Sequence, residues 1–169
     1  FPGLQGGPHD NVNIAKAVAF GEDLKPEFKV YCRQIVKNAK VLADSLMSNG
    51  LELVTNGTDN HLMVIKLVNK GLTGKGKEVQ NALDKAGITI NKNTVPYEPG
   101  SPFHPSGIRL GTPAVTTRGM KESEMKVIGK SIAKVIDNLD DNKVIGNVKK
   151  DILELCKRFP LYPGFDILK

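Results

Sequence analysis

The chain has 169 residues, 40% of them hydrophobic and 25% charged, which is typical of a soluble globular domain with a substantial core. No apolar run is long enough to span a bilayer and no secretory signal is recognisable, so we expect a cytoplasmic protein without a membrane segment. The formal net charge of +6 would suit a polyanion, but the lysines are interleaved with acidic residues and aromatic residues make up only 5%, so nucleic acid is not the expected partner.

The N-terminal residues predict a loop followed by a short helix. Residues 1–8 hold three glycines and two prolines and open with Phe instead of Met, so we expect either a processed start or a piece of something longer. A helix is expected over residues 10–20, with Asp10 or Asn11 as its N-cap and Gly21 as its end.

The clearest helix is expected over residues 26–49. Pro26 suits the first helical position, and Gly50 suits the left-handed residue that ends a helix. Apolar side chains three or four residues apart predict one buried stripe, formed by Phe28, Tyr31, Ile35, Ala39, Leu42 and Leu46.

The middle of the chain combines short strands with one helix and a long loop. Two apolar stretches separated by turn formers predict a pair of antiparallel strands, and Thr73 is expected to cap a helix that Gly87 ends. In chain order we expect strands at 51–54 and 61–68, a helix at 73–86, a strand at 88–90, a loop at 91–106 and a strand at 107–110. A loop of that length, here with four prolines, is usually functional in a compact domain.

Two amphipathic helices are expected to complete the chain. Their apolar positions run from Met125 to Leu139 and from Val144 to Phe159. The order of elements predicts an α/β fold, more closely an α+β small domain, with a small, mainly antiparallel sheet and helices packed on one face.

Arg109 is the first candidate binding residue. It lies near the end of the expected strand "GIRL", where a planar guanidinium could hold a carboxylate through two hydrogen bonds. Most arginines are paired with an acid of their own domain or are simply solvated, so position alone does not decide between the two.

Two glycine- and proline-rich stretches have binding interpretations as well as structural ones. Gly6 and Gly7 leave backbone N–H groups open to a phosphate, although most such pairs only form turns. The loop 91–106 carries Tyr97 and Phe103 among polar residues, so it could cradle a flat heterocycle or be a stiff surface loop.

The remaining reactive side chains favour structural interpretations. His61 could act as a general base, but a buried histidine satisfied by Asp59 or by the backbone is the simpler interpretation. Cys32 and Cys156 are far apart and the three histidines are scattered, so we expect buried reduced thiols and no metal site.

Several stretches together resemble serine hydroxymethyltransferase. "FPGLQGGP", "AKAVAF", "GTDNHL", "ITINKNTVP", "SPF" and "SGIRLGTPAVTTRG" follow in that family's order, across essentially this whole chain but well under half of the family's length. The resemblance implies the C-terminal part of a pyridoxal-phosphate enzyme of the aspartate aminotransferase group, fold type I. Such an enzyme interconverts serine plus tetrahydrofolate with glycine plus 5,10-methylenetetrahydrofolate, and is expected to be a homodimer or tetramer.

The resemblance also assigns domains and individual residues. It implies that residues 1–25 end the large cofactor-binding domain and that residues 26–169 form the C-terminal small domain. Arg109 matches the arginine that binds the substrate carboxylate, and Gly6 and Gly7 match glycines that reach the cofactor phosphate across the dimer interface. The folate-contacting positions match Asn93, Ser101, Pro102 and Phe103.

The family's cofactor-binding lysine, and its aspartate facing the pyridine nitrogen, lie upstream of Phe1 in that correspondence. We therefore expect this chain alone to be inactive. Two alternatives stay open. An aminotransferase of the same fold also binds carboxylates with an arginine but has no need of the folate loop, and the net charge admits a basic, non-enzymatic binding module.

Overall fold

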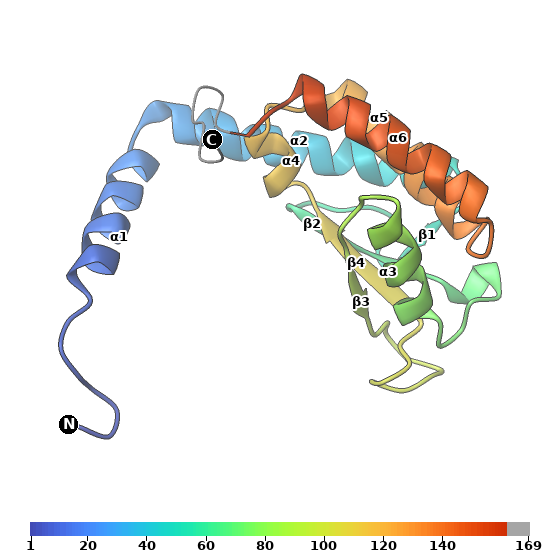
Figure 1. Cartoon of the computed structure of the whole chain (residues 1–169), viewed down its shortest axis with the longest axis horizontal. Coiled ribbons are helices and arrows are strands. Elements are labelled where there is room, and N and C mark those ends of the chain that lie inside the picture. The colour runs from blue at the N-terminus through green and yellow to red at the C-terminus, as the bar shows by residue number, and fades with distance from the viewer. Residues whose placement is uncertain (162–169) are drawn as a thin grey trace. The chain divides into compact units, whose positions relative to one another are not determined.

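The computed structural model describes residues 1–161, which fall into two compact units divided after Arg33 (Figure 1). The first unit contains an irregular N-terminal stretch, helix α1 (Asp10–Asp23) and the start of helix α2 (Pro26–Ser48). This division is based on contacts within the chain, whereas the domain boundary expected between residues 25 and 26 is based on the family resemblance. That boundary stays a prediction, and the end of the expected domain, 162–169, lies outside the described residues.

Helix α1 differs at both ends from its prediction. His9, not Asp10 or Asn11, is its N-cap, and the helix continues past Gly21 to Asp23. Gly21 is not among the glycines with positive φ, so it does not adopt the left-handed conformation by which a glycine ends a helix. The prediction of the ends was therefore wrong, although a helix forms as expected.

Helix α2 is present with nearly the expected bounds. It begins at Pro26 and ends at Ser48, and Gly50 follows with φ +79°. The buried stripe starts later than predicted, because Phe28 is 36% exposed and Tyr31 is only half-buried. From Ile35 onward the apolar positions are buried as expected.

The second unit contains a four-stranded antiparallel sheet. Its strands are β1 (Glu52–Leu53), β2 (Leu62–Lys66), β3 (Asn91–Asn93) and β4 (Gly107–Gly111), in the spatial order β1-β2-β4-β3. The antiparallel pair β1–β2 and the strand at β4 confirm the predictions. β4 is an inner strand, with β2 on one side and β3 on the other.

The strand expected at 88–90 is absent, and β3 lies three residues further on. Ile88 instead ends helix α3 (Gly76–Lys85): its N–H donates to the Leu83 carbonyl at 2.9 Å, while Gly87 takes φ +79°. This is the hydrogen-bond pattern with which glycine closes a helix. The apolar side chain of Ile90 is buried.

The start of α3 also differs from its prediction. Lys75, not Thr73, is the N-cap, and no side chain caps the helix. The Gly76 N–H donates instead to the Pro105 carbonyl at 2.8 Å, so the long loop before β4 satisfies the helix start.

Helices cover one face of the sheet, as the fold class predicted. Figure 1 shows α2, α5 (Glu122–Ile136) and α6 (Asn142–Arg158) running along one side of it. One hydrophobic cluster joins these helices and α3 to the strands, through the buried side chains of Leu53, Met63, Ile65 and Ile108. Alternate residues of the same strands, including Val64 and Arg109, lie on the other face, which is more exposed.

Short elements that the sequence did not predict connect these parts. They are the 3-10 turn η1 (Val68–Lys70) and helix α4 (Pro113–Thr117), which directly follows β4. Thr112, at the β4–α4 junction, is buried, and its hydroxyl donates to the Ile35 carbonyl in α2 at 2.8 Å.

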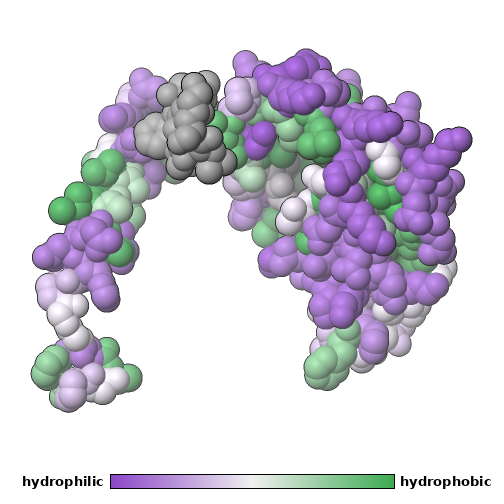
Figure 2. Space-filling view, in the orientation of Figure 1, coloured by the Kyte–Doolittle hydropathy of each residue, from purple (hydrophilic) through white to green (hydrophobic). Residues whose placement is uncertain are grey.

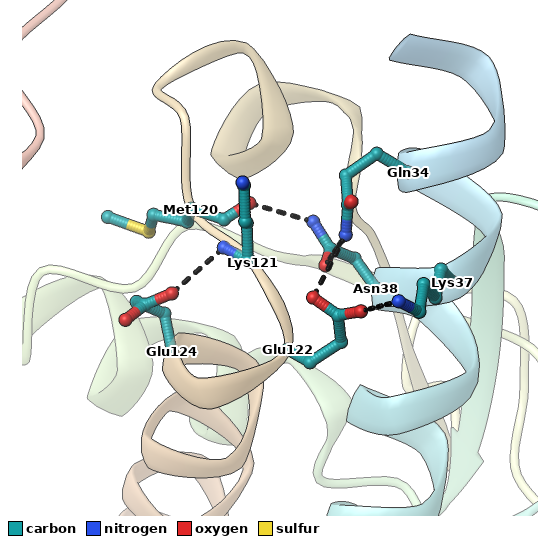
Figure 3. A network of polar contacts seen from close by, with 7 residues as sticks. All are labelled: Gln34, Lys37, Asn38, Met120, Lys121, Glu122 and Glu124. Atoms are coloured by element: carbon teal, nitrogen blue, oxygen red, sulfur yellow. Dashed lines mark hydrogen bonds and ion pairs between the residues drawn. The ribbon is translucent and has the colours of Figure 1, made fainter. Parts of the chain in front are cut away.

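A buried polar network joins α2 to the chain between α4 and α5 (Figure 3). Asn38 is fully buried; its side-chain nitrogen donates to the Thr116 hydroxyl and to the Met120 carbonyl, each at 2.9 Å. Its oxygen accepts from Gln34, which also donates to Glu122 at 3.2 Å. The network fixes the segment that leads out of β4.

Candidate functional site

Arg109 lies on the open face of the sheet, at the third of the five residues of β4. Ile108 before it is fully buried in the core, so the strand alternation turns Arg109 outward. Val64 and Asn91 stand directly opposite it on β2 and β3. Within residues 1–161, no hydrogen bond or ion pair engages the guanidinium.

Arg109 also borders an open hollow of about 340 Å³. The walls come from the end of the α3–β3 connection, the start of β2 and the end of β4, and include His61, Thr89, Asn91 and Gly111. A cation that is held in the middle of a sheet and left without an acid can bind an anionic group of a ligand.

Two glycines flank Arg109 on its own face of the strand. A Cβ on Gly107 would stand 2.6 Å from Val95 Cγ1 and 2.9 Å from the carbonyl oxygens of Asn93 and Ile65. A Cβ on Gly111 would stand 2.8 Å from the His61 carbonyl oxygen. The two glycines therefore let neighbouring backbone pack tightly on either side of Arg109, and the contact at Gly111 brings His61 to the rim of the hollow.

Gly107→Ala tests this close packing. We expect it to lower the free energy of unfolding by about 1–3 kcal/mol, because two of its three contacts are with backbone atoms that cannot turn away. Urea denaturation would measure the loss, with Gly146→Ala as the control, since nothing lies near that glycine. Equal stability of the Gly107 variant and the wild type would contradict the packing.

The expected loop at 91–106 begins with strand β3, so the proline-rich loop proper comprises residues 94–106. Asn93, at the end of β3, donates from its side chain to the Thr94 carbonyl at 2.6 Å. Ser101 and His104 bond to each other through their backbones, at 3.3 and 3.0 Å, with Pro102 and Phe103 forming the turn between them. The predicted folate contacts Ser101, Pro102 and Phe103 are thus brought into one tight turn, in which Phe103 is 80% exposed.

Glu98 organises the base of the proline-rich loop. Its carboxylate accepts backbone N–H groups from Val95 at 3.0 Å, Gly100 at 2.9 Å and Ser106 at 3.0 Å. Burial favours the neutral acid, but hydrogen bonds from Ser106, Gly100 and Val95 outweigh it and lower the pKa of Glu98 to about 2. Sequence reasoning missed this residue, because an acid within "YEPG" does not indicate that the loop folds so that Val95, Gly100 and Ser106 all direct their N–H groups to it.

The lowered pKa of Glu98 predicts acid sensitivity. The unfolded chain takes up this proton near the ordinary pKa of 4.5 and the folded chain only near 2, so the stability that Glu98 contributes is lost as the pH falls through that interval. Glu98→Gln should therefore lose less stability than the wild type between neutral pH and about pH 3.5. Denaturation at both pH values measures this, and an equal loss in the two proteins would contradict it.

His61 is exposed, so the expectation of a buried histidine satisfied by its neighbours was wrong. Its backbone carbonyl accepts from Thr112 N–H at 3.0 Å, which holds the chain next to the end of β4, while the residue itself borders the hollow beside Arg109. Asp59 pairs instead with Lys40, at 4.0 Å on the surface. The position of His61 follows from the strand pairing of β2 with β4, which leaves the residue just before Leu62 at the rim.

Gly6 and Gly7 belong to the first unit and are exposed. Nothing lies within 4 Å of the Cβ position of either glycine, so their backbone is open to an approaching group. That openness fits an anion such as a phosphate.

The surface lysines mix with acids, as the sequence indicated. Figure 2 shows a largely hydrophilic face over the helices of the second unit. Lys66 pairs with Glu52 at 2.7 Å, Lys70 with Asp137 at 2.8 Å and Lys157 with Glu154 at 2.6 Å. Such exposed pairs contribute little to stability. Because each of these lysines has an acidic neighbour, part of the positive surface charge is neutralised locally. No helix within residues 1–161 combines the length and apolar character that crossing a membrane requires.

The comparison with known proteins confirms the resemblance drawn from the motifs. The family model described as serine hydroxymethyltransferase matches residues 1–132. A protein named serine hydroxymethyltransferase from Endomicrobium trichonymphae is 53% identical over 166 residues, which covers 98% of this chain and 39% of that protein. The chain therefore belongs to the serine hydroxymethyltransferase family.

Proposed function

We propose that this chain is the C-terminal part of a pyridoxal-phosphate-dependent transferase. The whole enzyme would interconvert serine plus tetrahydrofolate with glycine plus 5,10-methylenetetrahydrofolate. Family membership supports this reaction, and the chain spans about two fifths of the length of the relative it matches. The activity therefore belongs to the longer protein, of which this chain supplies part of the site.

The observation that carries the proposal is the state of Arg109. Its guanidinium is exposed on an inner strand, borders a hollow and has no acid partner among the described residues. We assign it to the carboxylate of serine and glycine, which it would bind through two parallel N–H donors. Because an inner strand is rigid, the guanidinium would hold the bound amino acid in one orientation. That orientation decides which bond at the amino acid's Cα is aligned to break.

Gly6 and Gly7 fit the phosphate of the cofactor, because their backbone is open on the Cβ side. We propose that they reach the site of a second subunit, so that the protein acts as a homodimer or a higher oligomer. Pyridoxal phosphate, when bound, supplies an electron sink for the charge that develops at the substrate Cα. The lysine that anchors it would lie outside this chain, so the chain alone would be inactive.

We assign tetrahydrofolate to the proline-rich loop. Asn93 would offer amide hydrogen bonds to the edge of the pterin, and the exposed ring of Phe103 would offer it an apolar surface. The tight turn from Ser101 to His104 supports this assignment because it presents Pro102 and Phe103 at its tip. We also place the protein in the cytoplasm, and its two free cysteines support that location.

The test is turnover by the full-length protein. We expect glycine to form from serine only when tetrahydrofolate is present. Formation of a keto acid from serine, independent of folate, would favour the aminotransferase alternative instead. Salt-sensitive binding to heparin without any turnover would favour the basic binding module, although the lysine–acid pairs on the surface speak against it.

A further inference from the structure

Glu98 has an unusual set of partners for a surface-loop carboxylate. Oε2 accepts from both Val95 N and Ser106 N, at 3.0 Å each, and Oε1 accepts from Gly100 N at 2.9 Å. None of these partners is a cation. The negative charge is therefore stabilised by the backbone N–H dipoles of Val95, which precedes Glu98, and of Gly100 and Ser106, which follow it. One side chain thereby closes the loop from Val95 to Ser106.

The backbone around Glu98 is shaped to permit this grip. Tyr97, directly before it, takes φ +55°, a left-handed conformation that is uncommon for a bulky residue, while its side chain is fully exposed. A Cβ on Gly100 would stand 2.4 Å from the His104 carbonyl oxygen, so the Ser101–His104 turn lies directly against the residue that Glu98 holds. Displacing Gly100 would displace the turn.

The far end of the loop is fixed to the rest of the unit. Ser106 is fully buried; its hydroxyl accepts from Gly74 N–H at 2.9 Å and its carbonyl accepts from Leu67 N–H at 2.9 Å. Pro105 accepts from the first residue of α3. Glu98 therefore connects the loop to this anchor: one carboxylate oxygen bonds to Ser106 and the other to Gly100, so the two residues are held at a fixed distance from each other.

We propose that Glu98 is a positioning residue of the folate site: by holding three backbone N–H groups it sets the Ser101–His104 turn, and with it Pro102 and Phe103, in the arrangement that receives the pterin. Glu98 itself would not touch the ligand. This inference rests on the proposed function, and it assigns tetrahydrofolate affinity to a residue outside the predicted contacts.

The chemistry of the carboxylate distinguishes its variants. Glutamine keeps one acceptor oxygen, but its NH2 group would face an N–H donor on the other side, so one or two of the three hydrogen bonds are lost. Alanine loses all three. The KM for tetrahydrofolate should therefore increase in the order wild type, Glu98→Gln, Glu98→Ala.

The experiment measures steady-state kinetics of the full-length protein and its Glu98→Gln, Glu98→Ala and Glu78→Gln variants. Glu78 is the matched control, since it is exposed on α3 and borders a hollow with Lys70 and Asp137, which contains no residue of the proline-rich loop. We expect Glu98→Ala to raise KM for tetrahydrofolate by about tenfold, with kcat within about twofold and serine affinity unchanged. Amide hydrogen exchange at Val95, Gly100 and Ser106 should rise in the same order, and the control should match the wild type throughout.

Two results would overturn the inference: an unchanged KM for tetrahydrofolate in Glu98→Ala, or a parallel loss of serine and folate affinity, which would indicate general damage. If the KM is unchanged while amide exchange is faster, the hydrogen bonds of Glu98 exist but do not position the ligand. A wild-type protein that does not use tetrahydrofolate at all would instead remove the proposed function, so the wild-type measurement separates the two failures.

Discussion

Arg109→Ala in the full-length protein is expected to weaken serine binding by about 2–4 kcal/mol, which is roughly thirty- to nine-hundredfold in the dissociation constant. The reason is the loss of a charge-assisted, two-point contact from a guanidinium that the described chain leaves unpaired. Titration of the cofactor absorbance with serine would measure the change. Bound cofactor should be retained, because Arg109 is assigned to the carboxylate of the amino acid and not to the phosphate.

Two companion variants sharpen that measurement. Arg109→Lys keeps the charge but not the planar pair of donors, so it should recover only part of the affinity. Arg33→Ala removes an exposed arginine elsewhere and controls for the change in net charge. Normal serine affinity in Arg109→Ala would remove the carboxylate assignment, and release of the cofactor by that variant would mean that the residue acts on the cofactor instead.

Asn38→Ala should lower the free energy of unfolding by about 3 kcal/mol. The substitution leaves the Met120 carbonyl without the donor it has in the core (Figure 3). The hydrogen bond to the Thr116 hydroxyl is removed as well. It also opens a small cavity at a position that is completely buried. Urea denaturation would measure the loss.

The control for Asn38→Ala is Asn147→Ala, an exposed asparagine on α6 that should change stability little. Asn38→Ala with wild-type stability would show that water or a rearranged side chain replaces the lost hydrogen bonds. Because Asn38 joins α2 to the segment after β4, a stability loss accompanied by weaker serine binding would show that this network also supports Arg109.

The sequence was informative wherever a pattern was local. The spacing of apolar residues after Ile35, with Pro26 and Gly50 at the ends, was enough to predict helix α2, since these signals act within a few residues. It was misleading at 88–90, where Ile-Thr-Ile alternates like a strand, whereas Ile88 closes α3 and Ile90 packs in the core. A run of three residues is too short for its period to distinguish the two.

The site was only partly predictable for the same reason. The resemblance assigned roles to Arg109, Asn93 and residues 101–103, and those roles stay predictions; the tight turn at Ser101–His104 was not predicted. The exposure of His61 and the burial of Asn38 depend on partners far away in the chain. The hydrogen bonds of Glu98 depend on a loop fold that brings Ser106, eight residues on, to the same carboxylate as Val95 and Gly100. An isolated glutamate or asparagine in a sequence gives no indication of such partners.

The inner position of β4 has a consequence for how the proposed site would fail. Neighbouring strands hold β4 along both edges, so Arg109 cannot loosen by fraying as an edge strand or a loop would. Binding of the substrate carboxylate would then be lost only when the sheet unfolds cooperatively, and not before. A bound amino acid would in turn raise the temperature or the denaturant concentration at which the sheet unfolds.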